Sequence, residues 1–455
     1  MKRQARRKIN NQSGAAMLIS VVFFLFTSLA IISGLVTPTV REFRTANVNL
    51  NSKQSYFLAE SGSEDAFYRI RKNMTIGTSE TITLGSNTET TTITSISSSL
   101  KHIVSLGSVS SYERKSDLML STGAGVAFSY GVQIGDGGLE MESNSRVNGN
   151  AYSNGSILGA NGAVITNSAV VADATGKISF VTVNGNATGH FLEDITVGGN
   201  SNSVSLLRAT VGGNAVSDSV STCTIHGSAI YDTKTSCTIT GAQTTPNSTT
   251  FVDPVNIPLP ITASQITGFE NDAVAGGTVG SQSISGNVSL GPKKIDGNLT
   301  VENNATLIIT GTVWVTGTIS VNNNATVKLS PNYGGASGIL MAGVAGDSVK
   351  GQINLFNNVN LLGSGTAGSY LLVLSQRNNA TSTAIDLSNN VAGAIFYAGT
   401  GVINLSNNAA AKEITAYKLH LNSNTTVNYE SGLANTNFSS GPSVSWNVLT
   451  WKEAP

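Results

Sequence analysis

The sequence predicts a mainly β protein: an N-terminal membrane-spanning α-helix, a small antiparallel β head, and then a parallel β-solenoid (a β-helix) in two stacks. The chain of 455 residues contains 48 glycines and is rich in Asn, Ser and Thr, which is typical of many short strands joined by turns. One long apolar run stands near the start, and short phrases recur at fixed steps further on. Charged residues are only 11%, and 26 Lys plus Arg balance 26 Asp plus Glu. The chain therefore lacks the basic character of proteins that bind nucleic acid.

Residues 1–14 form a basic leader, and the next 22 residues, "AAMLISVVFFLFTSLAIISGLV", carry no charge. As a helix they would span roughly 33 Å, so we predict a membrane anchor from Ala15 to Val36. A cleaved secretory signal is the alternative, but the run is long for one and lacks a small-x-small cleavage site. Five cations in the leader place the N-terminus in the cytoplasm and everything after Pro38 outside: Lys2, Arg3, Arg6, Arg7 and Lys8.

The helix is expected to continue outward, bent at or near Pro38, so that one transmembrane and extended helix covers residues 15–73. The text beyond Pro38 is rich in helix-compatible residues. Its apolar positions make an imperfect stripe of an amphipathic helix: Phe57, Leu58, Ser61, Ala66, Phe67 and Ile70.

These features carry a resemblance. A basic leader ending in Gly14, an apolar helix that starts at once, and an outward amphipathic stretch with Ala59, Glu60, Ser61 and Gly62 resemble the N-terminal third of type IV pilin-like proteins. The texts "QSGAAMLISVVFFLF" and "YFLAESGSEDAFYRI" are similar to minor pilins of the PilX-like group. The resemblance covers roughly residues 1–125.

The resemblance implies that prepilin peptidase cleaves between Gly14 and Ala15 and that the new amino terminus is methylated. Major pilins carry a glutamate at the fifth mature position, where this chain has Ile19. In the family that carboxylate pairs with the amino group of a neighbouring subunit inside apolar surroundings. Its absence implies a minor or tip-located pilin rather than the repeating subunit of the shaft.

Residues 74–125 alternate polar and apolar residues over short spans separated by Gly, Ser and Asn. The spans "ETITL", "TETTTITSI", "KHIVSLGSV" and "RKSDLML" predict an antiparallel β meander. A helix followed by such a meander is what a small pilin-like head requires.

Residues 126–245 and 263–430 are predicted to form the two solenoid stacks, because their text repeats. Five phrases of the type "VGGN" start fourteen residues apart, at Val183, Val197, Val211, Ile225 and Ile239. An earlier "VNGNA" at Val147 has the same residue types in the same order, but its distance from Val183 is not a multiple of fourteen. Repeats this short cannot each bury a core, so they must stack.

Longer steps follow in the second stack. "VENNATL" at Val301 recurs twenty residues on, at Val321, and phrases at Ile385, Ile403 and Leu421 step by eighteen. In a parallel solenoid the aliphatic residues point inward, while Asn and Gly permit the corners and fall into ladders. Four Asn pairs are predicted to mark the turns: Asn303 and Asn304, Asn357 and Asn358, Asn389 and Asn390, and Asn407 and Asn408.

Cys223 and Cys237, the only two cysteines, occupy equivalent places in successive 14-residue repeats. Residues one coil apart lie about 4.8 Å from each other along the axis, within the Cα separation that a disulfide accepts. We predict that the two residues touch and that an extracytoplasmic location lets them oxidise. The alternative is a pair of reduced, buried thiols. Zinc is disfavoured, because no second Cys or His pair stands at ligand spacing and His226 alone cannot complete a site.

Residues 246–262 form a Pro-rich linker, with four of the nine prolines, which breaks β pairing. The text from Ile261 to Gly277 is expected to hold one short helix, such as a cap on the second stack. The last segment, 431–455, ends in "VSWNVLTWKEA", which alternates like a strand and is expected to close an open sheet edge.

No catalytic residue, metal or cofactor is predicted. From Val126 onward the carboxylates are sparse and do not read as a pair converging on one face, so the acids resemble a thin solubilising scatter. The densest acidic patch, "IGDGGLEME" from Ile134 to Glu142, lacks the ligand order of a calcium loop. The four histidines are isolated along the chain, and each is interpreted as a strand or turn residue: His102, His190, His226 and His420.

Two functions from different classes remain open. The first is a non-catalytic minor pilin or pseudopilin that displays a rigid solenoid for pilus assembly, adhesion or surface interaction. Its partners would be the membrane, other pilin-like subunits, the pilus assembly machinery and a glycan or other surface ligand. The second is a surface-tethered β-helix that binds or degrades polysaccharide. Both place a single-pass membrane protein with its bulk outside a prokaryotic cell or on a surface filament.

Overall fold

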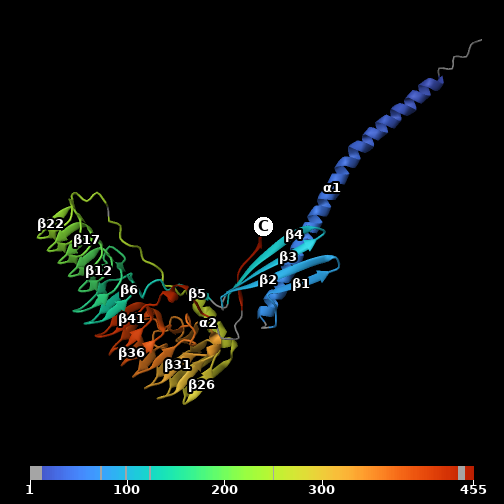
Figure 1. Ribbon diagram of the computed structural model, residues 1–455. Coiled ribbons are helices and arrows are strands. Elements are labelled where there is room, and N and C mark those ends of the chain that lie inside the picture. Colours follow the sequence, from blue (N-terminus) through green and yellow to red (C-terminus); the bar gives the residue numbers. More distant parts are fainter. Residues whose placement is uncertain are drawn as a thin grey trace, which may run out of the picture. The chain divides into compact units, whose positions relative to one another are not determined.

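The computed structural model describes residues 13–71, 74–97, 100–121, 124–249, 251–438 and 446–454. They belong to two compact units (Figure 1). The head unit comprises Met1–Thr94, His102–Leu120 and Val448–Pro455, and the solenoid unit comprises Ser95–Lys101 and Ser121–Asn447. The predicted basic leader lies outside the described residues up to position 12.

Helix α1 (Ser13–Arg71) is a single helix of 59 residues with Pro38 inside it (Figure 1). Within the described part of the chain it is the one helix long and apolar enough to cross a membrane. Nearly every side chain from residue 16 to residue 50 is exposed. The apolar half of α1 therefore has no packing partner among the described residues of its own chain.

The second half of α1 packs on the head sheet through small residues. Ser55, Ala59, Gly62 and Ser63 are buried, whereas Phe57 is 63% exposed and Ser61 is exposed too. The predicted stripe is therefore wrong at Phe57 and Ser61, although Ala66 and Ile70 are buried. The reason is the close approach of the two backbones: a Cβ at Gly107 would stand 2.1 Å from the carbonyl oxygen of Ser55. Large side chains cannot enter a contact this tight.

The head sheet is the predicted antiparallel meander with one added strand. Its order is β1 (Ser79–Leu84), β2 (Asn87–Ser97), β3 (Leu100–Val109), β4 (Tyr112–Ser121) and then β43 (Asn447–Ala454). The C-terminal strand thus covers the β4 edge. Trp451 Nε1 donates to Ser116 Oγ at 3.1 Å, and Arg114 pairs with Glu453 at 2.7 Å. An edge that would otherwise expose unpaired backbone groups is thereby closed.

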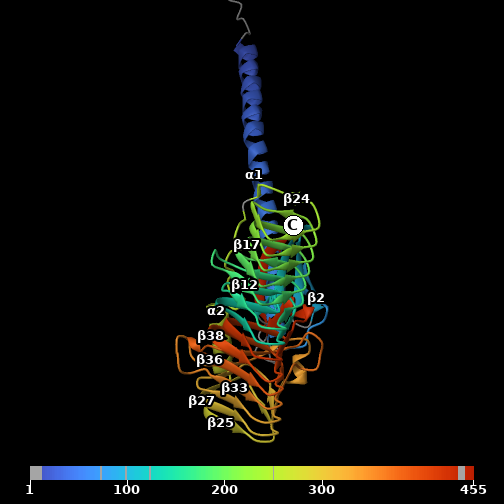
Figure 2. The same ribbon diagram turned by 90° about the vertical axis from the view of Figure 1, so that its left-hand side faces the viewer.

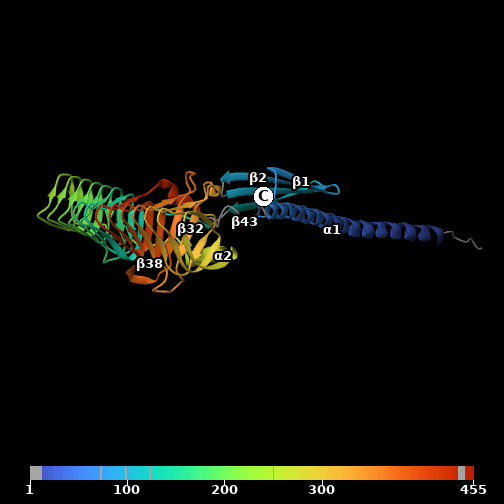
Figure 3. The ribbon, with the colours of Figure 1, turned by 90° about the horizontal axis from the view of Figure 1, so that it is seen from below.

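The solenoid is built of parallel rungs, as the repeats predict (Figure 3). The "VGGN" phrases lie directly above one another: Val183 pairs in register with Val197, Val197 with Val211, and so on to Ile239. Val147 belongs to the same column, because it pairs with Ile165 and Ile165 pairs with Val183. Two coils of eighteen residues therefore precede the coils of fourteen, and this explains the irregular spacing.

The two stacks form one continuous column although they come from separate segments (Figures 1 and 2). Strand β40 (Glu413–Leu421), in the last complete coil of the second segment, pairs in parallel with β6 (Val132–Met141), in the first coil of the first segment. Leu419 stands opposite Leu139 there, and both are buried in the main core. The chain thus enters the column in its middle, winds to β24 (Gln243–Thr244), and resumes at the opposite end with β25 (Thr278–Ile284).

One predicted repeat is displaced. Ile385 of β36 (Asn379–Ser388) pairs with Ile403 of β38 (Ile395–Leu405), as the eighteen-residue step requires. Ile403, however, pairs with Leu419 and not with Leu421. The register shifts because β38 bulges between Ala398 and Val402. The next inward residue therefore comes sixteen positions on.

The asparagines mark corners and stack as amide ladders. Seven of the eight predicted turn asparagines have positive φ, and Asn303 is the exception. Asn358 Nδ2 donates to Asn324 Oδ1 at 3.1 Å, and Asn390 Nδ2 donates to Asn358 Oδ1 at 3.0 Å. Asn tolerates the left-handed conformation, and its amide continues the hydrogen bonding from coil to coil.

The described residues of the Pro-rich segment, 246–249 and 251–262, form a strap along the outside of the first stack. Gln133 Nε2 donates to the carbonyl oxygen of Pro258 at 2.9 Å, and the backbone N–H of Ile257 donates to Asn154 Oδ1 at 3.1 Å. The strap leads into α2 (Ala263–Ala275), whose N-terminus is closed by a capping box between Thr262 and Gln265.

Helix α2 covers the side of the second stack rather than capping an end. Phe269 is buried in an outer apolar cluster formed by residues that point away from the main core. Strands β32 (Gly338–Ala342) and β35 (Leu371–Ser375) are buried on both faces, because one face lies in the main core and the other lies in this outer cluster. The outward members from the strands are Ile339, Met341, Leu372, Leu374, Ile395 and Tyr397.

Candidate functional site

The predicted processing site and anchor lie in the first half of α1. Gly14 and Ala15 are in its first turn, and Val36 is 51% exposed near its middle. Large apolar side chains surround the helix on all sides, for example Phe24 at 71% and Ile31 at 63% exposure. A helix that is apolar all round requires a lipid or a protein environment.

A buried carboxyl group lies where α1 meets the head sheet, and the sequence analysis did not single it out. Glu89 is fully buried, and its Oε1 accepts a hydrogen bond from Thr91 Oγ1. The Thr91 hydroxyl also lies 2.7 Å from Ser105 Oγ, which in turn accepts from Ser63 Oγ at 3.0 Å. Gly62 makes room for the carboxyl, since a Cβ there would stand 2.1 Å from Glu89 Cδ.

Glu89 Oε2 has no hydrogen-bond partner among the described residues. Burial raises the pKa of Glu89 above its ordinary 4.5, the Thr91 hydrogen bond opposes this, and the charge of Asp65 adds to it. The folded head therefore favours the protonated form of Glu89. In the unfolded chain the same carboxyl loses its proton at a lower pH. Its burial in this form stabilises the head fully at pH values below the pKa of Glu89 in the unfolded chain. This stabilisation is lost as the pH rises through the pKa of Glu89 in the folded head.

We expect Glu89→Gln to make the head more stable at pH 8 and to leave its stability at pH 4 nearly unchanged. The amide keeps the shape of the protonated carboxyl and cannot ionise. The effect is measured at both pH values by thermal unfolding of the head, with hydrogen exchange across β2 and β3 as the readout. Equal losses of stability from pH 4 to pH 8 in the native chain and the variant would contradict it.

The two cysteines occupy an inward column, one coil apart. The column runs through Val181, Ile195, Ala209, Cys223 and Cys237, each one residue before the Thr of its repeat. The Cα atoms of Cys223 and Cys237 are 4.5 Å apart, and the structure joins their sulfurs in a disulfide. Cys223 is buried and Cys237 is partly exposed. The bridge ties the last coil of the first stack to the coil below it.

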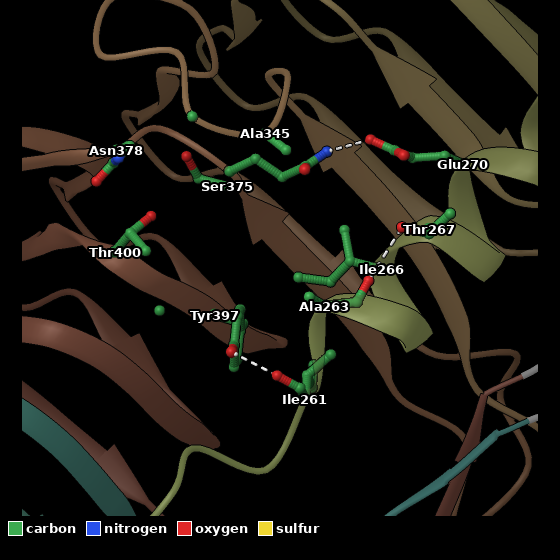
Figure 4. A pocket seen from close by; sticks show the side chains of 13 residues that line it. Ile261, Ala263, Ile266, Thr267, Glu270, Ala345, Ser375, Asn378, Tyr397 and Thr400 are labelled. Carbon is green, nitrogen blue, oxygen red and sulfur yellow. Dashed lines mark hydrogen bonds between the residues drawn. The ribbon is translucent and has the colours of Figure 1, made fainter.

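A cleft of about 300 Å³ lies between α2 and the side of the solenoid (Figure 4). Its rim on the helix side includes Ile261, Ile266 and Glu270. Its opposite wall comes from Ser375 at the end of β35 and from Tyr397 and Thr400 of β38. Gln376 Nε2 donates to Glu270 Oε1 at 2.9 Å, and Tyr397 Oη donates to the carbonyl oxygen of Ile261 at 2.8 Å. Burial raises the pKa of Tyr397 to about 12, so the phenol stays protonated.

Most polar side chains of this cleft already have protein partners: the hydroxyls of Thr267, Ser375 and Thr400 each donate to a backbone carbonyl oxygen. Glu270 is the one carboxylate among the lining residues. The cleft is therefore suited to hold α2 against the column and to take a small, mostly apolar group.

The four histidines lie in strands or at bends, as interpreted from the sequence, and three of them have carboxylate partners. His102 lies 3.2 Å from Asp117, His190 lies 2.8 Å from Asp253, and His420 lies 3.2 Å from Glu142. The His190 pair joins the strap to the first stack. Its partner is 63 residues away in sequence, so spacing along the chain could not reveal it.

The remaining acids of the predicted patch pair with cations or solvent. Glu140 accepts from Lys418 at 2.8 Å, and the described residues contain no group of three or more His, Cys, Asp or Glu that could hold a metal ion. A second buried carboxyl, Glu413, accepts from Thr415 Oγ1 at 2.7 Å, and burial raises its pKa. It lies on β40 and faces away from the main core.

No family model and no curated protein match the sequence. Among solved structures, the chain is similar to the competence-associated pilin ComZ from Thermus thermophilus, with 9% sequence identity and a TM-score of 0.21. The likeness covers 89% of this chain and 97% of that chain. The fold and the sites described above rest on this chain's own residues.

Proposed function

We propose that this chain is a membrane-anchored, pilin-like surface protein that displays a rigid β-solenoid for filament assembly, adhesion or surface interaction. One observation carries the proposal: the first half of α1 is apolar and exposed, while the second half packs on an antiparallel sheet. Such a helix can stand in a bilayer and afterwards among the helices of neighbouring subunits, since both surroundings accept its side chains.

The role proposed within a filament is that of a minor pilin of the PilX-like kind. Ile19 takes the place where major pilins carry a glutamate, so the chain brings no carboxylate to pair with a neighbour's amino terminus. A subunit with this property suits a tip or accessory position. Its proposed partners are other pilin-like subunits and the assembly machinery, with the N-terminus in the cytoplasm before processing.

The solenoid is proposed to be non-catalytic. Carboxylates of the solenoid engage protein partners, as Glu140 does with Lys418. Where two carboxylates meet, at Glu193 and Asp194, the guanidinium of Arg208 pairs with both. Retaining and inverting glycosidases need two carboxyl groups facing each other across the scissile bond. Turnover of any polysaccharide by the full chain, abolished by one carboxylate substitution, would favour the alternative of a tethered enzyme.

Mass spectrometry of the mature N-terminus tests the pilin-like assignment. We expect a methylated Ala15 in the native chain and an unprocessed leader in Gly14→Val, because the larger residue obstructs the peptidase at the cleaved bond. A matched control is Gly34→Val, twenty residues further along the exposed helix, which should be processed normally. An intact Met1 in the native chain would leave only a tethered ectodomain, and cleavage beyond Val36 would identify a secretory signal.

A further inference from the structure

A polar groove lies on the outer face of the solenoid where the two segments join. It has a volume of about 300 Å³ and crosses β36, β38, β40 and β6. Residues 380–383, which belong to an irregular stretch of β36, form one wall. We call this site the polar groove; its lining side chains are Glu140, Ala380, Thr381, Thr383, Val402, Asn404, Lys418 and His420.

The floor of the groove belongs to a longer row of polar side chains. Register pairs Asn354 with Asp386, Asp386 with Asn404, Asn404 with His420, and His420 with Glu140. Successive coils are about 4.8 Å apart, so the five side chains extend over about 19 Å. The row ends at Leu158, which pairs with Glu140 and is 41% exposed.

Hydrogen bonds hold these side chains in fixed orientations. Asn404 Nδ2 donates to Asp386 Oδ1 at 2.8 Å, and Asn404 Oδ1 accepts from Asn422 Nδ2 at 2.6 Å. Lys418 pairs with Glu140 at 2.8 Å. All of these residues are partly exposed, so their remaining donors and acceptors face solvent. A preorganised set of donors and acceptors loses little entropy when a ligand binds.

The chemistry of the groove selects an uncharged, hydroxyl-rich ligand. Glu140 is the one carboxylate that lines the groove, and it pairs with the one lining ammonium, Lys418, so the lining offers no excess charge to an ionic ligand. Behind the lining, Asp386 bonds to Asn404 and Glu142 lies beside His420, and these carboxylates oppose an anionic ligand. Asn404, His420 and the carboxylates can each accept from or donate to hydroxyl groups. Val402 and Ala380 offer apolar contact for the C–H face of a sugar ring.

An extended peptide is a poorer fit. Peptides that bind sheets usually add a strand to an open edge. Here β36, β38, β40 and β6 are internal strands whose backbone groups are already paired on both sides. Recognition must therefore come from side chains, and each coil supplies one side chain to the row. The spacing of about 4.8 Å between coils is close to the length of one sugar unit in an extended chain.

We propose that the polar groove binds a linear, neutral polysaccharide lying along the solenoid axis, across the coils of Asn354 to Glu140. This deepens the proposed display function, on which it rests, by naming the class of surface ligand. The ligand would cover about four coil spacings, so affinity should rise with chain length up to four or five sugars and then level off.

The test uses the full chain in detergent micelles and isothermal titration calorimetry. The probes are neutral hexasaccharides (β-1,4-glucose, β-1,4-N-acetylglucosamine, β-1,4-mannose and α-1,4-glucose) and, at equal length, an α-1,4-galacturonic acid hexasaccharide. We expect at least one neutral probe to bind and the acidic probe not to bind. Asn404→Ala and His420→Ala should each weaken binding about tenfold, as expected for the loss of one or two hydrogen bonds to the ligand.

His226→Ala is the matched control, because His226 is exposed on the first stack outside the groove and its replacement should leave affinity unchanged. Unfolding curves of all variants establish that they are folded. Failure of every neutral probe, preference for the acidic probe, or unchanged binding by Asn404→Ala would each overturn the proposal. A methylated Ala15 together with such a result would leave the pilin-like function standing and remove only its proposed ligand.

Discussion

Leu139→Ala is expected to lower the free energy of unfolding by about 2–5 kcal/mol, because it removes buried methyl groups where neighbouring coils cannot collapse into the gap. Leu139 is 1% exposed and stacks between Leu419 of the second segment and Ile157 of the first. Coils stabilise mainly their nearest neighbours, so a cavity here also weakens the coupling of the two segments. Urea unfolding of the full chain in micelles should show a lower midpoint and a broader or divided transition.

Leu158→Ala supplies the matched control. Leu158 lies one coil away, but its side chain points outward and is 41% exposed, so its truncation should change stability by less than about 0.5 kcal/mol. If both leucine variants lost equal stability, or if Leu139→Ala left the midpoint unchanged, the two segments would not share a core at this junction.

The rungs could be predicted because their register is encoded locally. Each "VGGN" phrase carries an inward aliphatic residue followed by small residues, so equal spacing along the chain becomes vertical alignment in the column. The predicted role of its glycines as left-handed corners is wrong, because in these coils the residues with positive φ precede the phrases: Phe180, Asp194, Arg208, Thr222 and Ser236. Val183, Val197 and Val211 are aligned as predicted. The Asn pairs were recognisable for the same reason, since few residues other than Gly and Asn readily take a left-handed corner.

The continuity of the column could not be predicted from repeats. The junction pairs Leu419 with Leu139, which are 280 positions apart and share no repeated phrase. A parallel strand edge accepts any suitably patterned partner, so its choice depends on the whole chain path. The bulge after Ala398, which displaces the repeat at Leu421, falls on Gly399 and Gly401, and these glycines lie outside the repeated phrases.

The polar groove could not be predicted from the sequence for a related reason. In the sequence, Asp386, His420 and Glu140 are parts of a sparse distribution of acids and isolated histidines. The junction brings Glu140 beside His420 although 280 residues separate them. Side chains that gather only through such a long connection give no spacing signal, whereas Cys223 and Cys237, one repeat apart, do.

The disulfide provides the last prediction. Replacing both cysteines by serine should destabilise the end of the first stack by about 3 kcal/mol, the value expected for closing a loop of this length. The effect should be local, because the bridge joins the final coil, whose strands β22 (Thr233–Thr235) and β24 (Gln243–Thr244) are exposed. Hydrogen exchange should become much faster across residues 233–244 and stay unchanged near Val147. Reductant should have the same effect on the native chain and none on the double variant. Unchanged exchange in residues 233–244 after reduction would show that the stacked coils hold this end without the bridge.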